Sequence, residues 1–261
     1  MDAMHAISSA TRALAEDPNA YGPVPVGCER IVTPRYVIWL SARPGVPFTV
    51  VQRLRFHEDE VEEVVAEIRG VLRDRGRSES SWEVGSSATP SDLVDRLRAL
   101  GMSPFEEPRV VGMVLTGNLP AGSGIDPRRV ASLEEYVEAR RIQAIAFGQT
   151  GHQGSAELLA REWEEEQAGA GRATYLAWLD GTPVAAGAAK FTPAGVVLNG
   201  AGTLPQARGH GAFRALVEAR WRDGLARGVP AVVVQAGAMS RPILERLGFV
   251  AVCDVAILVD G

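Results

Sequence analysis

A glycine-containing turn at residues 208–212 constrains the fold of this chain more than any other segment. It joins an apolar run at residues 196–204 to an amphipathic run at residues 213–227, and it reads Arg208, Gly209, His210, Gly211 and Ala212. The first run predicts a strand and the second a helix. The first amides of a helix lack an intrahelical acceptor and carry the positive end of the helix dipole. Because glycine has no β-carbon, an anion can approach this backbone closely, and the turn predicts a pyrophosphate pocket.

Two other interpretations of the glycine-rich stretch compete with this one. Gly200, Ala201 and Gly202 begin like a dinucleotide-binding fingerprint, but the third glycine would fall on Pro205, where no helix starts. That mismatch excludes a Rossmann-type site. The turn could also be a tight strand-to-helix connection that binds nothing. The residues of the turn alone do not distinguish this connection from a pyrophosphate pocket.

The downstream sequence alternates strands and helices. Residues 231–235 form a short β-branched run that predicts a buried strand. Residues 240–247 predict a short helix that ends at Gly248, and residues 249–259 predict a further strand. The predicted order is therefore strand, phosphate turn, helix, strand, helix, strand.

This order and two motifs resemble the GNAT superfamily of N-acetyltransferases. The first motif is Gln206-Ala207-Arg208-Gly209-His210-Gly211, and the second is Ile243-Leu244-Glu245-Arg246-Leu247-Gly248-Phe249. The resemblance covers roughly residues 125–261. It implies an α/β fold with a mixed sheet and the transfer of an acetyl group from acetyl-CoA to an amine.

The resemblance also implies where acetyl-CoA would bind. The pyrophosphate would lie on the main-chain amides of the turn and first helical residues, which are Arg208, Gly209, His210, Gly211, Ala212 and Phe213. The pantetheine arm would pair with the preceding strand, at the main chain of Ala201 and Thr203. A backbone amide near the thioester would stabilise the oxyanion of the tetrahedral intermediate.

The groups that would move protons are less evident. Family members often carry a tyrosine that acts as the general acid, and Leu244 stands at that position here. We therefore consider Ser240, one helical turn earlier, as a substitute acid. Alternatively, Ser240 is only the N-cap of the short helix. An alkylamine with a pKa of about 10.4 needs a base. His152 is the candidate base, with a solvated loop histidine as the alternative. Residues Glu162, Glu164, Glu165 and Glu166 predict a solvated helix face, or alternatively a surface that attracts a cationic amine.

The first half of the chain suggests a repeat of the second. Residues 59–73 and 91–100 predict helices, and residues 81–84 and 109–115 predict strands. At an offset of 147, Leu97, Leu100, Gly101 and Met102 fall on Leu244, Leu247, Gly248 and Phe249. We therefore expect two tandem GNAT-like halves, a degenerate one at residues 1–120 and an acetyl-CoA-binding one at residues 121–261.

The degenerate half is not expected to bind CoA. Where the second half has its glycine turn, the first has the acidic residues Glu58, Asp59 and Glu60, which would occupy the helix N-terminus and repel a pyrophosphate. We expect this half to support the other or to supply one wall of the acceptor pocket, because ligand sites often lie between domains.

Composition limits the partners and the compartment. The net charge is −5, with no basic stripe, which argues against nucleic acid. No run approaches the roughly 18 apolar residues of a membrane span, and no cluster of metal ligands is evident. The two cysteines, Cys28 and Cys253, are too few for a disulfide framework, and the N-terminus does not resemble a secretory signal. These features favour the cytoplasm.

The sequence thus predicts an N-acetyltransferase that uses acetyl-CoA directly, without a covalent enzyme intermediate. The alternative is a catalytically silent acyl-CoA-binding module with a sensor or regulatory role. The acceptor, a small-molecule or protein amine, and the oligomeric state, with a homodimer among the alternatives, are left open.

Overall fold

The computed structural model describes residues 7–41, 48–105, 109–119, 125–149, 154–169, 171–229 and 231–261. The first half of the chain consists of α1 (Ser9–Glu16), α2 (Pro18–Tyr21), β1 (Cys28–Val32), β2 (Val37–Ser41), β3 (Phe48–Gln52), the 3-10 turn η1 (Glu58–Glu60), α3 (Val61–Arg73), β4 (Ser80–Gly85), α4 (Leu93–Ala99), β5 (Ser103–Pro104) and β6 (Val110–Leu115).

The second half consists of β7 (Asp126–Arg129), α5 (Leu133–Ala146), α6 (Ala156–Gln167), β8 (Arg172–Leu179), β9 (Thr182–Thr192), β10 (Gly195–Thr203), the 3-10 turn η2 (Pro205–Ala207), α7 (Ala212–Ala226), β11 (Val232–Ala236), α8 (Arg241–Arg246) and β12 (Val250–Asp260). Every strand and helix predicted from the sequence is present, with ends that shift by at most two residues. The predicted boundary between residues 120 and 121 lies outside the described residues.

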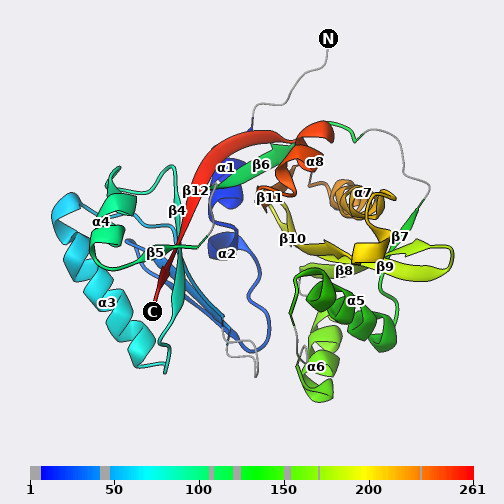
Figure 1. The fold of residues 1–261 in the computed structure, drawn as a ribbon, viewed down its shortest axis with the longest axis horizontal. Helices are drawn as coiled ribbons and strands as arrows, with labels where there is room; N and C mark the ends of the chain where they lie inside the picture. The colour runs from blue at the N-terminus through cyan, green and yellow to red at the C-terminus, as the bar shows by residue number, and fades with distance from the viewer. Residues whose placement is uncertain are drawn as a thin grey trace, which may run out of the picture.

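All strands join one mixed sheet in which the two halves exchange a strand. The order is β1-β2-β3-β4-β12-β6-β11-β10-β9-β8-β7, with β5 beside β12. β12, from the second half, pairs antiparallel with β4 of the first, and β6 pairs antiparallel with β11 of the second. β6 and β12 pair with each other at the centre, where Figure 1 shows them crossing between the two lobes.

Moving outward from this central pair, the strands of the two halves follow nearly the same arrangement. β3 and β4 run parallel in one half, as β10 and β11 do in the other. The helices α4 and α8 also end alike: Gly101 has a φ of 96° and Gly248 a φ of 94°, and the residue after each glycine bonds back to Leu97 or Leu244. The predicted internal repeat is therefore present in the fold.

Helices cover both faces of the second half of the sheet. In Figure 1, α7 lies on one side of β8, β9 and β10, and α5 and α6 lie on the other. The apolar face of α7 includes Leu216 and Val217, both fully buried in the larger core cluster. On the opposite face, Tyr136 and Ile142 of α5 form a separate cluster with Leu159 of α6.

The acidic run on α6 departs from the sequence-based prediction. Glu162 and Glu166 are only 1% and 4% exposed, so the run is not a solvated face throughout. Glu162 accepts a hydrogen bond of 2.8 Å from the Tyr136 hydroxyl, and Glu166 accepts bonds of 2.6 and 2.8 Å from the Thr174 amide and hydroxyl. Both carboxylates are buried because these partners replace water.

Among the helices of the described residues, none has the length and apolar character needed to cross a membrane.

Helix α1 ties the central strands to the first half through two adjacent acidic residues. Glu16 accepts a hydrogen bond of 2.6 Å from the Ser87 amide, and Asp17 accepts one of 3.0 Å from the Arg53 amide. Asp17 is 2% exposed. Its burial, and next the neighbouring charge of Glu16, raise the pKa of Asp17 from 3.8 to about 7.

We predict that Asp17 makes the protein less stable as pH rises from about 4 to about 7. In this window the folded state holds a proton that the unfolded chain has released, so unfolding becomes more favourable by up to about 1.4 kcal/mol per pH unit. Urea unfolding at several pH values should show this decline for the wild type and a smaller one for Asp17→Asn. The same substitution at the exposed Asp95 is the control; identical pH profiles for Asp17→Asn and wild type would contradict the prediction.

Candidate functional site

The glycine turn has the geometry expected of an anion site. Gly209 and Gly211 have φ values of 85° and 87°, in the region that favours glycine, and Gly211 is the N-cap of α7. Within the part of the chain that the structure describes, no side chain caps this helix N-terminus. Arg208, Gly209 and His210 are exposed. The first amides of α7 therefore face an open turn, and an anion placed there would meet unpaired donors.

A slot opens beside the turn because two parallel strands diverge. β10 and β11 pair only at Val196 with Val232 and at Val197 with Val233. Beyond these pairs, β10 bulges between Asn199 and Gly202. Ala201 and Thr203, the expected partners of a pantetheine arm, lie on this diverging part of β10 and are half-buried.

The glycines of β10 serve this bulge and the packing of α5. Gly200 has a φ of 55°, and its carbonyl accepts a hydrogen bond of 2.7 Å from Gln143 of α5. A β-carbon at Gly202 would lie 2.4 Å from the β-carbon of Ala146. The stretch that begins like a dinucleotide fingerprint thus allows a helix to approach a bent strand.

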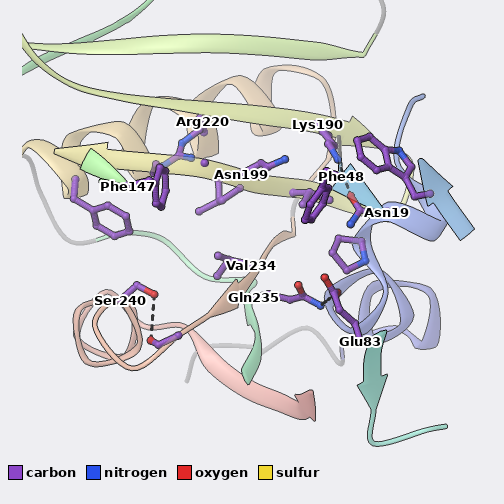
Figure 2. A pocket seen from close by; sticks show the side chains of 18 of the residues that line it. Asn19, Phe48, Glu83, Phe147, Lys190, Asn199, Arg220, Val234, Gln235 and Ser240 are labelled. Atoms are coloured by element: carbon purple, nitrogen blue, oxygen red, sulfur yellow. Dashed lines mark hydrogen bonds between the residues drawn. The ribbon is translucent and has the colours of Figure 1, made fainter. Parts of the chain in front are cut away.

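A cavity of about 810 Å³ continues from this slot into the space between the two halves. β10 forms one wall, and β11 with the segment up to Ser240 forms the facing wall, as Figure 2 shows. Phe213 of α7 and Phe147, which follows α5, lie in the lining. The first half closes the cavity with residues that include Pro18, Asn19, Trp39, Ser41, Phe48 and Glu83. The first half therefore contributes to the lining of this cavity; that the cavity receives an acceptor stays a prediction.

Among the described residues that line this cavity, Glu83 of β4 is the one carboxylate, and sequence reasoning missed it. Its Oε2 accepts hydrogen bonds from the side-chain amides of Gln52 and, at 3.0 Å, of Gln235. Figure 2 shows Glu83 and Gln235 side by side. Burial raises the pKa of Glu83 above its usual value, while the two amides and the charge of Lys190 act in the opposite direction. The group is thus a buried carboxyl that can hold or release a proton.

Lys190 and Trp39 form a second polar feature at the same end. Lys190 Nζ donates a hydrogen bond of 3.0 Å to Asn19 and lies 5.7 Å from the centre of the Trp39 ring. The Trp39 and Phe48 rings meet edge to face, with centroids 6.0 Å apart. A cation, an amide and two aromatic rings together can hold a polar molecule with an apolar part.

Two arginines lie along the β10 side of the cavity. Arg140 of α5 donates a bond of 3.1 Å to Gln143, the residue that holds the Gly200 carbonyl, and its Nε lies 4.0 Å from Glu162. Arg220 of α7 is fully buried, and burial lowers its pKa to about 10. Arg220 therefore remains a cation at neutral pH.

Of the two residues predicted to transfer protons, Ser240 and His152, the structure describes only Ser240. Ser240 lines the cavity, and its hydroxyl donates a hydrogen bond of 3.3 Å to the Gly237 carbonyl. It makes no N-cap bond with its side chain, so the plain capping interpretation does not describe it. Leu244, at the position where family members often carry tyrosine, is fully buried in the core. His152 lies outside the described residues.

The corresponding slot in the first half is bridged by protein. Beyond the ends of β3 and β4, the Thr89 amide donates to the Leu54 carbonyl at 3.2 Å, and the Phe56 amide donates to the Thr89 hydroxyl at 3.1 Å. At the start of its helix, the Glu60 carboxylate accepts a bond of 2.7 Å from the His57 amide. The acidic residues thus occupy this helix entrance, as predicted.

The fold is similar to several solved structures. A GCN5-related N-acetyltransferase from Kribbella flavida is 21% identical, with a TM-score of 0.69 over 99% of this chain and 96% of that one. A tandem GNAT protein from the clavulanic acid biosynthesis pathway is 17% identical, with a TM-score of 0.62 over 90% of this chain and 84% of that one. A GCN5-related N-acetyltransferase from Sphaerobacter thermophilus is 14% identical, with a TM-score of 0.58 over 86% of this chain and 80% of that one.

No protein-family model and no curated protein sequence matches the chain. The structural similarity nevertheless extends through both halves, and it includes a protein that is itself a tandem. The predicted fold is therefore confirmed: the chain has the mixed α/β fold of the GCN5-related N-acetyltransferases, in two tandem halves.

A pair of substitutions at Gly209 tests the anion site. A β-carbon there would have open space around it but an unfavourable φ, so Gly209→Ala measures strain alone. Gly209→Glu adds a negative charge beside the amides of α7. We expect Gly209→Ala to weaken CoA binding less than about tenfold and Gly209→Glu to weaken it more than about 100-fold. Calorimetric titration with CoA measures the affinity of each variant. Equal affinities of Gly209→Ala and Gly209→Glu would show that the phosphates of CoA do not bind at this turn.

Proposed function

We propose that this protein is an N-acetyltransferase that transfers the acetyl group of acetyl-CoA directly to an amine held between the two halves. One observation carries the proposal: a single cavity is lined both by the slot between β10 and β11 and by the end wall of the first half. Such a cavity can take a donor from one side and an acceptor from the other. The fold supports acyl transfer as the class of reaction.

The donor would bind as the sequence motifs imply. Its pyrophosphate would lie on the amides of residues 208–213, and its pantetheine arm would follow β10 past Ala201 and Thr203. Two features support this arrangement: the left-handed glycines at the entrance to α7 and the divergence of β10 from β11. The thioester would then lie beside the bulge, near Asn199 and Gly200.

Glu83 is our proposed base for the acceptor amine. An ammonium must lose a proton before its nitrogen can attack a thioester, and Glu83 is a buried carboxyl that lines the cavity. Its pKa is raised by burial, which makes it a stronger base than an exposed carboxylate. This assignment takes the place that His152 held in the sequence-based hypothesis.

Ser240 remains our proposed donor of a proton to the departing CoA thiolate. Its hydroxyl lines the cavity at the end of the wall that begins with Val234 and Gln235. A serine is a weak acid, but a thiol has a pKa of about 8.5, so the thiolate can depart with modest assistance. We therefore expect Ser240→Ala to slow turnover without abolishing it.

A silent acyl-CoA-binding module is the alternative, and the buried Leu244 in place of a tyrosine acid favours it. Release of free thiol from acetyl-CoA decides between the two functions. A panel of polyamines, amino acids, aminoglycosides and a lysine peptide should contain at least one amine that accelerates this release. Micromolar CoA binding without thiol release from any amine would instead support the binding module.

The first half should contribute to chemistry through Glu83. With an amine that turns over, we expect Glu83→Gln to lower kcat/KM by about 100-fold, because the base is lost. Glu79→Gln, the same change at an exposed site on the adjoining segment, is the control.

The pH profile separates a base from a structural residue. Glu83 acts only when deprotonated, so wild-type activity should rise as pH passes upward through its raised pKa. The Glu83→Gln variant should lose that limb and keep only the rise due to the amine itself. A profile unchanged in shape would show that Glu83 does not accept the proton.

The reducing cytoplasm is the proposed setting. Neither Cys28 nor Cys253, both among the described residues, forms a disulfide, which supports that choice. Burial raises the pKa of Cys253 to about 12, so this thiol is protonated and unreactive at neutral pH.

A further inference from the structure

Arg220 is the one fully buried arginine in the core of the described chain, and its charge lacks a counter-ion there. Within the described residues, no carboxylate forms an ion pair with it, and the electrostatic neighbour that most affects its pKa is the Tyr175 hydroxyl. Buried charges in proteins are normally paired, because an isolated charge loses its hydration without compensation. The position therefore requires an explanation beyond core packing.

The guanidinium is held in a fixed place behind the bulge of β10. Its Nε donates a hydrogen bond of 2.8 Å to the Leu216 carbonyl, and its Nη1 donates one of 3.1 Å to the Ala188 carbonyl. A β-carbon at Gly187 would lie 3.1 Å from Nη1 and 3.1 Å from the β-carbon of Ala201. Glycine at position 187 thus leaves the space that the guanidinium occupies.

One nitrogen of the Arg220 guanidinium makes no hydrogen bond within the described residues. Nη2 is buried and has no hydrogen-bond partner among the described residues. Arg220 nevertheless lines the cavity, together with Asn199, Gly200 and Ala201. Figure 2 shows Arg220 on the β10 side of the cavity, and Val234 and Gln235 on the opposite side. The buried positive charge of Arg220 therefore borders the part of the cavity where the proposed function places the thioester.

We propose that Arg220 stabilises negative charge on the acyl oxygen of the bound thioester, with Nη2 as the donor. This inference rests on the proposed function. The amine nitrogen attacks the carbonyl carbon, the π electrons move to oxygen, and the C–N bond forms. The oxyanion then collapses and the C–S bond breaks; the second proton that the attacking nitrogen must lose is the one that the departing CoA thiolate gains, by way of the Ser240 hydroxyl. A fixed cation beside that oxygen lowers the barrier without reorganising, because its position is already set.

Two CoA derivatives test this without knowledge of the acceptor. S-carboxymethyl-CoA carries a permanent negative charge near the acyl position, and S-carbamoylmethyl-CoA is its neutral counterpart of nearly equal shape. Calorimetric titration of the wild type should give at least about tenfold tighter binding of the charged derivative. Arg220→Met should reduce this preference to within about twofold, and Arg220→Lys, which keeps the charge, should retain part of it.

The same substitution on the exposed face of α7, Arg222→Met, should keep the full preference of the wild type. Equal affinity of the wild type for the two derivatives would overturn the proposal, and so would a preference that persists in Arg220→Met. If Arg220→Met fails to fold, the wild-type comparison and Arg220→Lys decide the question. Absence of binding by CoA itself would instead reject the proposed function, so the two failures can be told apart.

Discussion

The antiparallel pairing of β6 with β12 joins the two halves at the centre of the sheet, and the rest of the structure depends on it. Each of these strands also completes the other half, because β12 pairs with β4 and β6 pairs with β11. Neither half therefore has a complete sheet of its own. The second half supplies the two facing walls of the cavity and the first half closes its end, so their relative position is fixed by backbone hydrogen bonds rather than by a flexible contact between domains.

The elements of this fold could be predicted because their signals are local. The glycines at 209 and 211, the apolar spacing of α7 and the β-branched run of β11 each specify their own conformation. The matching ends of α4 and α8 are also local, since Gly101 and Gly248 take the same left-handed turn. These features were enough to indicate a repeat and the half that carries the glycine turn without a side-chain cap.

The polar groups of the cavity could not be predicted in the same way, because their partners are distant in the chain. Glu83 looks like any polar residue of a strand until β4 meets the residues around Gln235. Outside the cavity, Glu162 belongs to an ordinary acidic run until Tyr136, 26 residues earlier in the chain, packs against it. Some signal was present for others: Lys190 interrupts an apolar strand, and Arg220 shares a helical face with Leu216.

The exchanged strands also set an order of events during synthesis on the ribosome. The edge of β4 that β12 covers stays open until residues 250–260 have emerged, long after residues 80–85. An open edge of this kind is a template for pairing with other chains. We therefore expect the nascent first half to be the aggregation-prone stage in the life of this protein, and the stage at which a chaperone would matter most.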